Sequence, residues 1–272
     1  MNQTIGFIGC GKMGQAILSG IIERKGIESS NIYVSTRTER TLQELTNKFK
    51  IQGTIDNLLV AKKSDILFLA VKPNLYGEII ESIKNAVREK VIVVTVAAGI
   101  DTEYVRKAFG KDVKVVRTMP NTPSMVGEGM TPYCINEFVT EDDLSIVETL
   151  LQSIGKCERI SENLMDAIPA ISGSSPAYVY MMIEAMADGG VKQGIPREQA
   201  YKLAAQAVLG AAKMVMATGR HPGALKDDVC TPGGATIEAV SSLEKTGFRS
   251  SILTAMDECT NKIKFLGETM KS

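Results

Sequence analysis

The chain has 272 residues, of which 44% are hydrophobic and 23% charged, and its 31 basic and 31 acidic side chains give a formal net charge of zero. This length suffices for two domains with a substantial core. The balanced charge argues against a nucleic-acid or anionic-membrane partner, because such binders carry a basic surplus. No apolar run is long enough to cross a bilayer, and the first residues lack the pattern of a signal peptide.

Residues able to bind a metal are few and scattered. The five cysteines form no C-x-x-C pair, so neither a disulfide framework nor a zinc site is predicted. The single histidine, His221, precedes a proline in a loop and is expected to be structural rather than catalytic. We therefore expect a cytoplasmic protein in a reducing compartment, with no catalytic metal.

The first half of the chain alternates strand and helix patterns. Short apolar runs predict strands over residues 4–8, 32–35, 66–71, 91–96 and 113–117, with later strands at 132–134 and 156–159. Helical spacing of apolar residues predicts helices over residues 39–49 and 141–153. Continuous apolar runs are typical of parallel strands that are buried on both faces. We therefore expect an α/β fold, with a doubly wound parallel sheet of the Rossmann type over residues 1–162.

The second half, residues 163–272, is expected to be an all-α domain. Ser175-Pro176 predicts the start of a helix over residues 177–187 that ends at Gly189-Gly190, and a second helix is expected over residues 197–216. These helices are apolar on most sides and must be buried on most sides, which predicts a homo-oligomer built through this second half of the chain. The alternative is a monomer whose first domain covers the helices.

A glycine-rich turn follows the first predicted strand and opens a helix. In that context the pattern Gly9-x-Gly11-x-x-Gly14 is typical of dinucleotide binding. The first glycine permits a tight turn, the second lets the pyrophosphate approach, and the third permits close helix packing. Lys12 and Met13 lie within the same turn, and the alternative is a plain glycine turn that binds no nucleotide.

The end of the second strand bears on the choice between NAD and NADP. It reads Ser35-Thr36-Arg37, with no acidic residue before Glu39. Two hydroxyls and a guanidinium suit a 2′-phosphate, whereas a carboxylate there would bind the ribose hydroxyl. NADPH is therefore favoured over NADH, unless Arg37 is only a solvated surface charge.

Three later strand ends are expected to border the same crevice. The cofactor candidates at these ends are Val71, Lys72, Pro73, Ala97, Ala98, Gly99 and Asn121. Lys72 either contacts the ribose or the substrate, or it only caps the end of its strand with a solvated charge. The small residues after the fourth strand leave room for a nicotinamide ring or pack against a helix, and the Asn121 amide offers polar contacts.

A second glycine-rich turn, Thr231-Pro232-Gly233-Gly234-Ala235-Thr236, leads into a helical pattern over residues 237–244. The first-turn N–H groups of a helix lack intrahelical partners and suit a small anion such as a carboxylate. Gly234, Ala235 and Thr231 are the candidate ligands of that carboxylate. The alternative is that Thr231 and Thr236 are only helix caps.

Taken together, these segments resemble the pyrroline-5-carboxylate reductases over essentially the whole chain. The matching segments are residues 9–16, 71–73, 117–123, 172–178, 187–191, 225–237 and 247–250. The Pro-Gly-Gly-Ala-Thr segment, residues 232–236, is the most specific of these. One departure is Ser174-Ser175, where many members of the family read Ser-Gly before the proline.

The resemblance implies an NAD(P)H-dependent oxidoreductase that reduces 1-pyrroline-5-carboxylate to L-proline, the last step of proline biosynthesis. It implies a homodimer, assembled in many members into a decamer of five dimers. Thr236 would hydrogen-bond the ring nitrogen as the catalytic residue, and Ser174 and Ser175 would border the substrate. The alternatives are a β-hydroxyacid dehydrogenase, for which Lys192 and Lys213 sit in no matching motif, and a nucleotide sensor without activity.

Overall fold

The computed structural model describes residues 3–271, with side chains to residue 268. The chain divides into two compact units, Met1–Ser174 with Cys259–Ser272, and Ser175–Glu258. The last segment thus belongs to the first unit, a return that the sequence pattern does not predict. The expected domain division between residues 162 and 163 stays a prediction.

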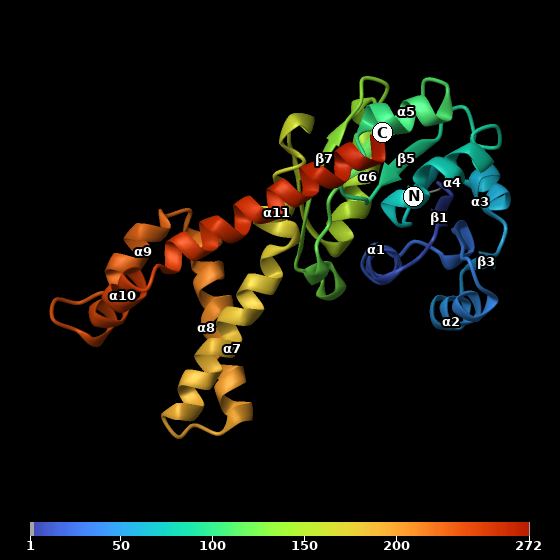
Figure 1. The fold of residues 1–272 in the computed structure, drawn as a ribbon. Coiled ribbons are helices and arrows are strands. Elements are labelled where there is room, and N and C mark those ends of the chain that lie inside the picture. Colours follow the sequence, from blue (N-terminus) through green and yellow to red (C-terminus); the bar gives the residue numbers. More distant parts are fainter. Residues whose placement is uncertain (1–2, 272) are drawn as a thin grey trace. The chain divides into compact units, whose positions relative to one another are not determined.

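The first unit is built on one eight-stranded sheet with the order β3-β2-β1-β4-β5-β6-β7-β8 (Figure 1). Strands β1 to β6 are parallel, β7 is antiparallel to β6, and β8 is parallel to β7. The order of the first six strands is that of a doubly wound dinucleotide-binding sheet, so the expected fold class is confirmed. The strands are β1 (Ile5–Ile8), β2 (Ile32–Ser35), β3 (Gln52–Thr54), β4 (Ile66–Leu69), β5 (Ile92–Thr95), β6 (Lys114–Thr118), β7 (Gly129–Ile135) and β8 (Gly155–Arg159).

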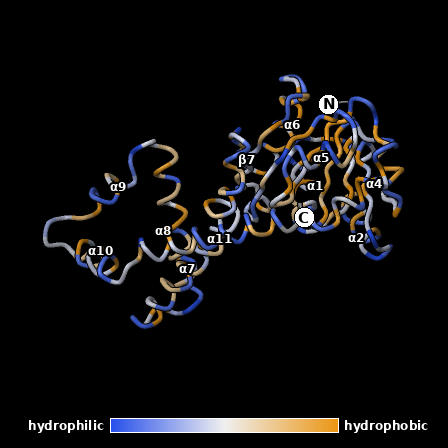
Figure 2. Tube along the Cα trace, turned by 45° about the horizontal axis from the view of Figure 1, so that its top comes forward, coloured by the Kyte–Doolittle hydropathy of each residue, from blue (hydrophilic) through white to orange (hydrophobic). Residues whose placement is uncertain are grey.

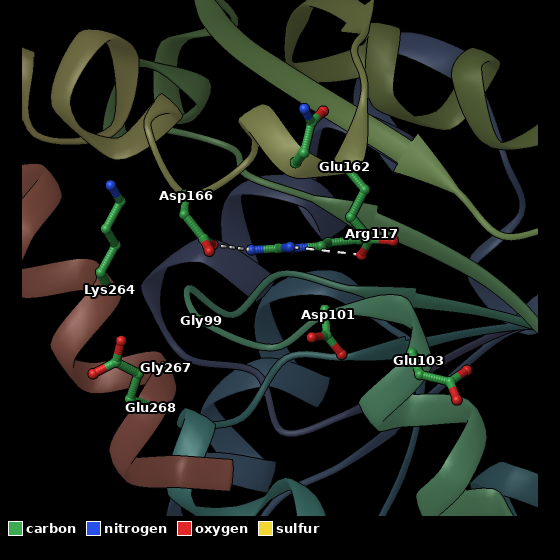
Figure 3. A pocket seen from close by; sticks show the side chains of 10 residues that line it. Gly99, Asp101, Glu103, Arg117, Glu162, Asp166, Lys264, Gly267 and Glu268 are labelled. Atoms are coloured by element: carbon green, nitrogen blue, oxygen red, sulfur yellow. Dashed lines mark hydrogen bonds and ion pairs between the residues drawn. The ribbon is translucent and has the colours of Figure 1, made fainter.

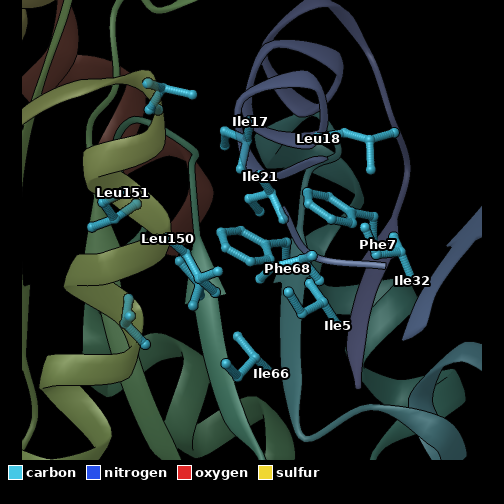
Figure 4. Close-up of a cluster of buried hydrophobic side chains, with 14 of the residues drawn as sticks. Ile5, Phe7, Ile17, Leu18, Ile21, Ile32, Ile66, Phe68, Leu150 and Leu151 are labelled. Carbon is cyan, nitrogen blue, oxygen red and sulfur yellow. The ribbon is translucent and has the colours of Figure 1, made fainter. Parts of the chain in front are cut away.

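Helices cover both faces of this sheet and bury two separate hydrophobic clusters. Figure 4 shows the first cluster, in which Ile17 and Ile21 of one helix face Phe7 and Phe68 of the central strands. The Phe7 and Phe68 rings stack with their centroids 4.7 Å apart. Truncating Ile17, which is fully buried, to alanine removes about 2–5 kcal/mol of stability. The helices of this unit are α1 (Lys12–Lys25), α2 (Glu39–Phe49), α3 (Asn57–Lys63), α4 (Tyr76–Ile83), α5 (Thr102–Phe109) and α6 (Glu141–Leu151).

The last two strands of the sheet carry a close backbone contact. Gly129 and Gly155 face each other at the start of β7 and β8. A Cβ atom on Gly155 would lie 2.0 Å from the carbonyl oxygen of Gly129, and its φ of 143° is accessible to few other residues. Only glycine at position 155 therefore permits this register.

The second unit is entirely helical among its described residues. It contains α7 (Ser175–Lys192), α8 (Arg197–Thr218), α9 (Pro222–Val229), α10 (Ala235–Lys245) and the start of α11 (Phe248–Lys271). None of the described helices is long and apolar enough to span a membrane.

The predicted end of the first of these helices at Gly189-Gly190 is wrong, because α7 continues to Lys192. A Cβ atom on Gly190 would lie 3.3 Å from the Cβ of Ala200 on α8. The glycine therefore permits close packing of α7 against α8 instead of ending the helix. Chain reversal comes later, at Gly194, which has a φ of 92°.

The α7–α8 pair carries large apolar side chains that the single chain leaves exposed. Met181, Leu203 and Met216 have exposed fractions of 69%, 60% and 72%. In both helices the buried residues are alanines only, at positions 187, 200 and 204. Figure 2 shows hydrophobic residues along much of α8. An apolar surface of this kind indicates contact with another protein surface.

Candidate functional site

The parallel strands bring the predicted cofactor residues to one edge of the sheet. Five strands end at, or shortly before, a residue that the sequence predicts to bind the cofactor. These residues are Gly9 after β1, Ser35 at the end of β2, Val71 after β4, Ala97 after β5 and Asn121 after β6. Because the carboxyl ends of parallel strands share one edge, these residues lie along one edge of the sheet, where such folds bind their ligands. The structure thus assembles the cofactor candidates from five separate segments.

The three glycines of the first turn have three different surroundings. Gly9 has a φ of 75°, and a Cβ there would lie 2.5 Å from Cγ1 of Val71. A Cβ on Gly14 would lie 3.2 Å from the Cβ of Ala70, so this position permits close packing. A Cβ on Gly11 would meet no atom within 4 Å. The open space over Gly11 fits the approach of a pyrophosphate, as the motif predicts.

The start of α1 is left without a side-chain cap. Its N-cap residue is Gly11, no side chain accepts a hydrogen bond there, and its first turn holds no acidic residue. Lys12 is exposed and Met13 half-buried in the same turn. The helices α2, α3, α5 and α6, in contrast, are capped by Thr38, Asp56, Asp101 and Thr140. The free N–H groups and the helix dipole of α1 suit a phosphate group.

The residues expected at a 2′-phosphate lie at the end of β2. The buried Ser35 hydroxyl donates a hydrogen bond to Oδ1 of Asn57 at 2.7 Å. The Thr36 hydroxyl donates to the carbonyl of Thr38 at 2.9 Å. Arg37 is exposed and forms no ion pair with any residue that the structure describes. Its guanidinium is therefore available to an anion.

Asn57 is a residue that sequence reasoning missed. It opens α3 directly after the short strand β3, and β3 was itself not predicted, because Gln52-Gly53-Thr54 has no apolar run. The signal that was present is Asp56-Asn57, a typical helix start. Recognising that start would have placed another polar side chain beside Ser35.

The ends of β4 and β5 differ in exposure. Lys72 is exposed and precedes the short 3-10 helix Pro73–Leu75, while Val71 is half-buried. Ala97 and Gly99 are buried, Ala98 is half-buried, and Gly99 has a φ of 76°. The exposure of Lys72 fits both interpretations: its side chain contacts the ribose or substrate, or it is only a solvated charge at the end of the strand.

The Asn121 amide is engaged inside the first unit. Its Nδ2 donates to the carbonyl of Ser172 at 2.9 Å, and its Oδ1 accepts from the N–H of Met130 at 3.0 Å. Asn121 therefore braces the segment that leads toward α7. Its contact with a cofactor stays a prediction.

A charged network lies beside the loop after β5 and lines a cavity of about 420 Å³ (Figure 3). Arg117 of β6 is 3% exposed, and its guanidinium lies 2.6 Å from Asp166 and 3.6 Å from Glu162. Glu162 also accepts from the N–H and the hydroxyl of Thr102, at 2.8 and 2.7 Å. The network joins β6 to the start of α5. Sequence reasoning missed it, although an arginine within an apolar strand was a signal.

The second glycine-rich turn opens α10 in the way that Gly11 opens α1. The N-cap residue is Gly234, and no side chain caps the helix. The N–H of Gly234 donates to the carbonyl of Thr231 at 3.0 Å, and Gly233 has a φ of 68°. A Cβ on Gly234 would lie 2.3 Å from the hydroxyl of Thr231.

This geometry bears on the capping alternative for the two threonines. Neither Thr231 nor Thr236 caps α10, so that alternative is not supported. Ala235 and Thr236 are the first two residues of the helix, and the first-turn N–H groups remain free of side-chain acceptors. The turn has the properties of a carboxylate site.

Comparison with known proteins decides the family. A family model described as pyrroline-5-carboxylate reductase dimerisation matches residues 162–266, and one described as NADP oxidoreductase, coenzyme F420-dependent, matches residues 4–99. The pyrroline-5-carboxylate reductase of Escherichia coli K12 is 45% identical over 269 residues, which cover 99% of this chain and 100% of the relative. This chain belongs to the pyrroline-5-carboxylate reductase family. The resemblance inferred from the sequence motifs is confirmed.

More distant relatives agree. The pyrroline-5-carboxylate reductase of Methanosarcina acetivorans is 40% identical, over 98% of this chain and 99% of the relative. A solved pyrroline-5-carboxylate reductase from Coxiella burnetii superposes with a TM-score of 0.91 at 34% identity, covering 98% of this chain and 99% of that one. A Plasmodium falciparum pyrroline carboxylate reductase, solved with NADP bound, has a TM-score of 0.89 at 33% identity, with 98% of both chains covered.

The remaining candidates are placed as follows. Ser174 ends a π-helical turn, Pro169–Gly173, and its hydroxyl accepts from the thiol of Cys259 at 3.3 Å, while Ser175 begins α7. His221 caps α9 by accepting the N–H of Gly223 on Nδ1, the structural role expected for it. Among the described residues, no group of histidine, cysteine or acidic side chains has the arrangement of a metal site.

The dimerisation segment of the family model, residues 162–266, includes α7 and α8. These are the helices whose apolar side chains are exposed in the single chain. The two observations together indicate self-association through the helical segment, as the sequence predicted.

Proposed function

We propose that the chain reduces the C=N bond of 1-pyrroline-5-carboxylate with NADPH and releases L-proline. The observation that carries this proposal is the pair of glycine-capped helix starts, at Gly11 of α1 and Gly234 of α10. One suits the pyrophosphate of a dinucleotide and the other suits a small carboxylate. Family membership supplies the identity of the imine.

The residues at the sheet edge fit the dinucleotide. The open approach over Gly11 and the uncapped start of α1 accommodate the pyrophosphate, and the exposed Arg37 accommodates a 2′-phosphate. When bound, the reduced nicotinamide supplies the hydride, which is added to the imine carbon. What the chain must add is placement, because a correctly oriented pair of reactants removes much of the barrier.

The residues of the second turn act on the imine. The N–H groups at the start of α10, with the Thr231 hydroxyl, hold the carboxylate and so fix which ring atom faces the hydride donor. The Thr236 hydroxyl hydrogen-bonds the ring nitrogen, which gains a proton as the double bond is reduced. A donor placed on an atom whose charge changes is an effective source of catalysis. Ser174 and Ser175 border the ring.

The exposed apolar side chains of α7 and α8 support a homodimer in which a second copy covers them. The family resemblance extends this to a decamer of five dimers. The five free cysteines support a reducing compartment and so a cytoplasmic location. Light scattering on the wild type and on Leu203→Asp distinguishes an oligomer from a monomer, and the substitution is expected to dissociate the oligomer. An oligomer that survives this substitution, or a monomeric wild type, would contradict the assignment of this surface.

The deciding experiment is a reductase assay. Purified protein is mixed with 1-pyrroline-5-carboxylate and either NADPH or NADH, and loss of the reduced-nicotinamide absorbance is followed together with formation of proline. Turnover that depends on the imine is expected, faster with NADPH. No turnover with either cofactor rejects the proposal, and oxidation of β-hydroxy acids with NADP⁺ would favour the dehydrogenase alternative.

A further inference from the structure

Tyr76 places its hydroxyl between the ends of two neighbouring strands. It is the first residue of α4, and its side chain is completely buried. The hydroxyl donates a hydrogen bond to the carbonyl of Leu69 at 2.6 Å and accepts one from the N–H of Val96 at 3.4 Å. Leu69 is the last residue of β4, and Val96 directly follows β5. One oxygen atom therefore bridges the two strand ends.

The bridge stands where regular pairing of the strands stops. The β4–β5 register ends with Leu69 opposite Thr95. Beyond that pair β4 and β5 are no longer paired directly, and the buried main-chain groups that face each other there require replacement partners. The Tyr76 hydroxyl supplies both a donor and an acceptor at this point.

The hydroxyl keeps its proton under all ordinary conditions. Burial raises the pKa of Tyr76 well above its usual range, and hydrogen bonds from the N–H groups of Val96 and Ala97 offset only part of that effect. The group is thus a permanent donor to Leu69 as well as an acceptor.

Both bridged strands lead into loops that the proposed function gives to the cofactor. The segment Val71-Lys72-Pro73 begins two residues after Leu69, and Ala97-Ala98-Gly99 begins directly after Val96. Neither loop is joined to the other by the regular β4–β5 pairing, which ends before both of them. Their separation depends on whatever holds the two strand ends together.

We propose that Tyr76 is a positioning residue, whose hydroxyl fixes the spacing of the two loops that receive the nicotinamide half of the cofactor. The proposal rests on the proposed function, and it assigns Tyr76 no contact with cofactor or substrate. It predicts an effect confined to one half of the dinucleotide. The adenosine half is expected at Arg37, after β2, on the other side of β1 from β4 and β5.

The test is Tyr76→Phe, which keeps the buried ring and removes only the bridge. Dissociation constants are measured by calorimetry for NADPH and for 2′,5′-ADP, which carries the adenosine and its 2′-phosphate but no nicotinamide. Loss of the bridge is expected to raise the dissociation constant of NADPH about tenfold. The constant for 2′,5′-ADP is expected to stay within about twofold of the wild type, since its contacts lie outside the bridge.

Tyr133→Phe is the matched control. Tyr133 on β7 is also buried, and its hydroxyl donates to the carboxylate of Glu148 on α6, a contact that involves neither β4 nor β5. This control reports the cost of removing a buried tyrosine hydroxyl elsewhere in the unit. Both dissociation constants are expected to remain at the wild-type values.

Several results would overturn the proposal. Equal weakening of NADPH and 2′,5′-ADP, unchanged NADPH binding, or failure of Tyr76→Phe to fold would each assign the hydroxyl to general stability. Because binding is measured without an imine, a wild type that binds NADPH but does not reduce pyrroline-5-carboxylate contradicts the proposed function and leaves this test intact. A wild type that binds no NADPH contradicts both.

Discussion

Arg117 and Asp166 form an ion pair at 2.6 Å in which the arginine side chain is 3% exposed and the aspartate side chain 45%. The guanidinium is thus almost completely buried, whereas its carboxylate partner is half-exposed. Glu162 is a second partner, 3.6 Å away. Removing the partners of a buried charge destabilises a protein more than replacing the charged side chain itself by an apolar one.

The first prediction follows from this asymmetry. The double variant Glu162→Ala with Asp166→Ala strands the Arg117 charge and should cost about 3–5 kcal/mol of stability. Arg117→Met removes the charge together with its desolvation penalty and should cost less. Denaturant unfolding measures the free energy of unfolding of each variant and so ranks their losses of stability. Arg40→Met, which breaks an exposed pair with Glu44, is the control and should leave the midpoint unchanged.

The two glycines Gly9 and Gly11 should respond differently to the same substitution. Gly11→Ala adds a methyl group into open space, so the thermal midpoint should hold while NADPH binding weakens at least about tenfold through obstruction of the pyrophosphate. Gly9→Ala forces a Cβ against Val71 at a φ of 75°, and should lower the midpoint itself. Calorimetry and thermal melts on both variants give the comparison. Intact NADPH affinity in Gly11→Ala would remove the pyrophosphate from this turn.

Arg37→Ala tests the choice of cofactor. Loss of a charge-assisted contact to the 2′-phosphate should raise the KM for NADPH by about tenfold or more and leave the KM for NADH nearly unchanged. Steady-state kinetics with both cofactors, at low and high salt, measure the effect. Arg40→Ala, on the exposed side of α2, is the matched control. Equal changes for the two cofactors would refute the phosphate contact.

Most strands and helices of the first unit were predictable from simple patterns of apolar residues. Buried strands are continuous apolar runs, and helices carry apolar residues at helical spacing. The runs at residues 32–35 and 39–49 predicted β2 and α2 with their observed bounds. The strand β3 has polar residues at an edge of the sheet and gave no apolar signal. The continuation of α7 through Gly189 and Gly190 was unpredictable for another reason. A glycine that ends a helix and one that admits a neighbouring helix look alike in sequence.

The site was predictable where motifs mark main-chain geometry and unpredictable where side chains meet across the fold. The two glycine turns were found because their geometry is local. The contact of Ser35 with Asn57 and that of Arg117 with Asp166 join residues 22 and 49 positions apart. Only the sheet order brings such residues together, and sequence spacing carries no trace of it.

Thr236→Ala tests the proposed contact to the ring nitrogen. Loss of one donor to the changing charge should lower kcat/KM by about ten- to a thousandfold. Because Thr236 caps no helix, the thermal midpoint should change little, and Thr236→Ser should recover much of the activity. Thr246→Ala, whose hydroxyl bonds only the carbonyls at the end of α10, is the control. Full activity in Thr236→Ala would remove it from the reaction.

Two buried thiols should be inert in the folded protein. Burial raises the pKa of both Cys10 and Cys134 to about 12, so almost no thiolate is present near pH 8. Titration with a disulfide reagent at that pH should modify neither until denaturant is added. The same shifts make a contribution to stability that is complete below the unfolded thiol pKa of about 8.5 and is lost as the pH rises toward 12. Rapid native-state labelling of Cys10 would contradict this.

The contact of α11 with the loop after β5 has a practical consequence for handling the protein. A Cβ on Gly267 would lie only 3.6 Å from the carbonyl oxygen of Gly99, so the last described turns of α11 lie beside a loop expected to face the nicotinamide. Thr4, in contrast, precedes β1 at the edge of the sheet opposite Gly9. An affinity tag, fluorophore or surface linker should therefore disturb this loop less when it precedes β1 than when it follows α11.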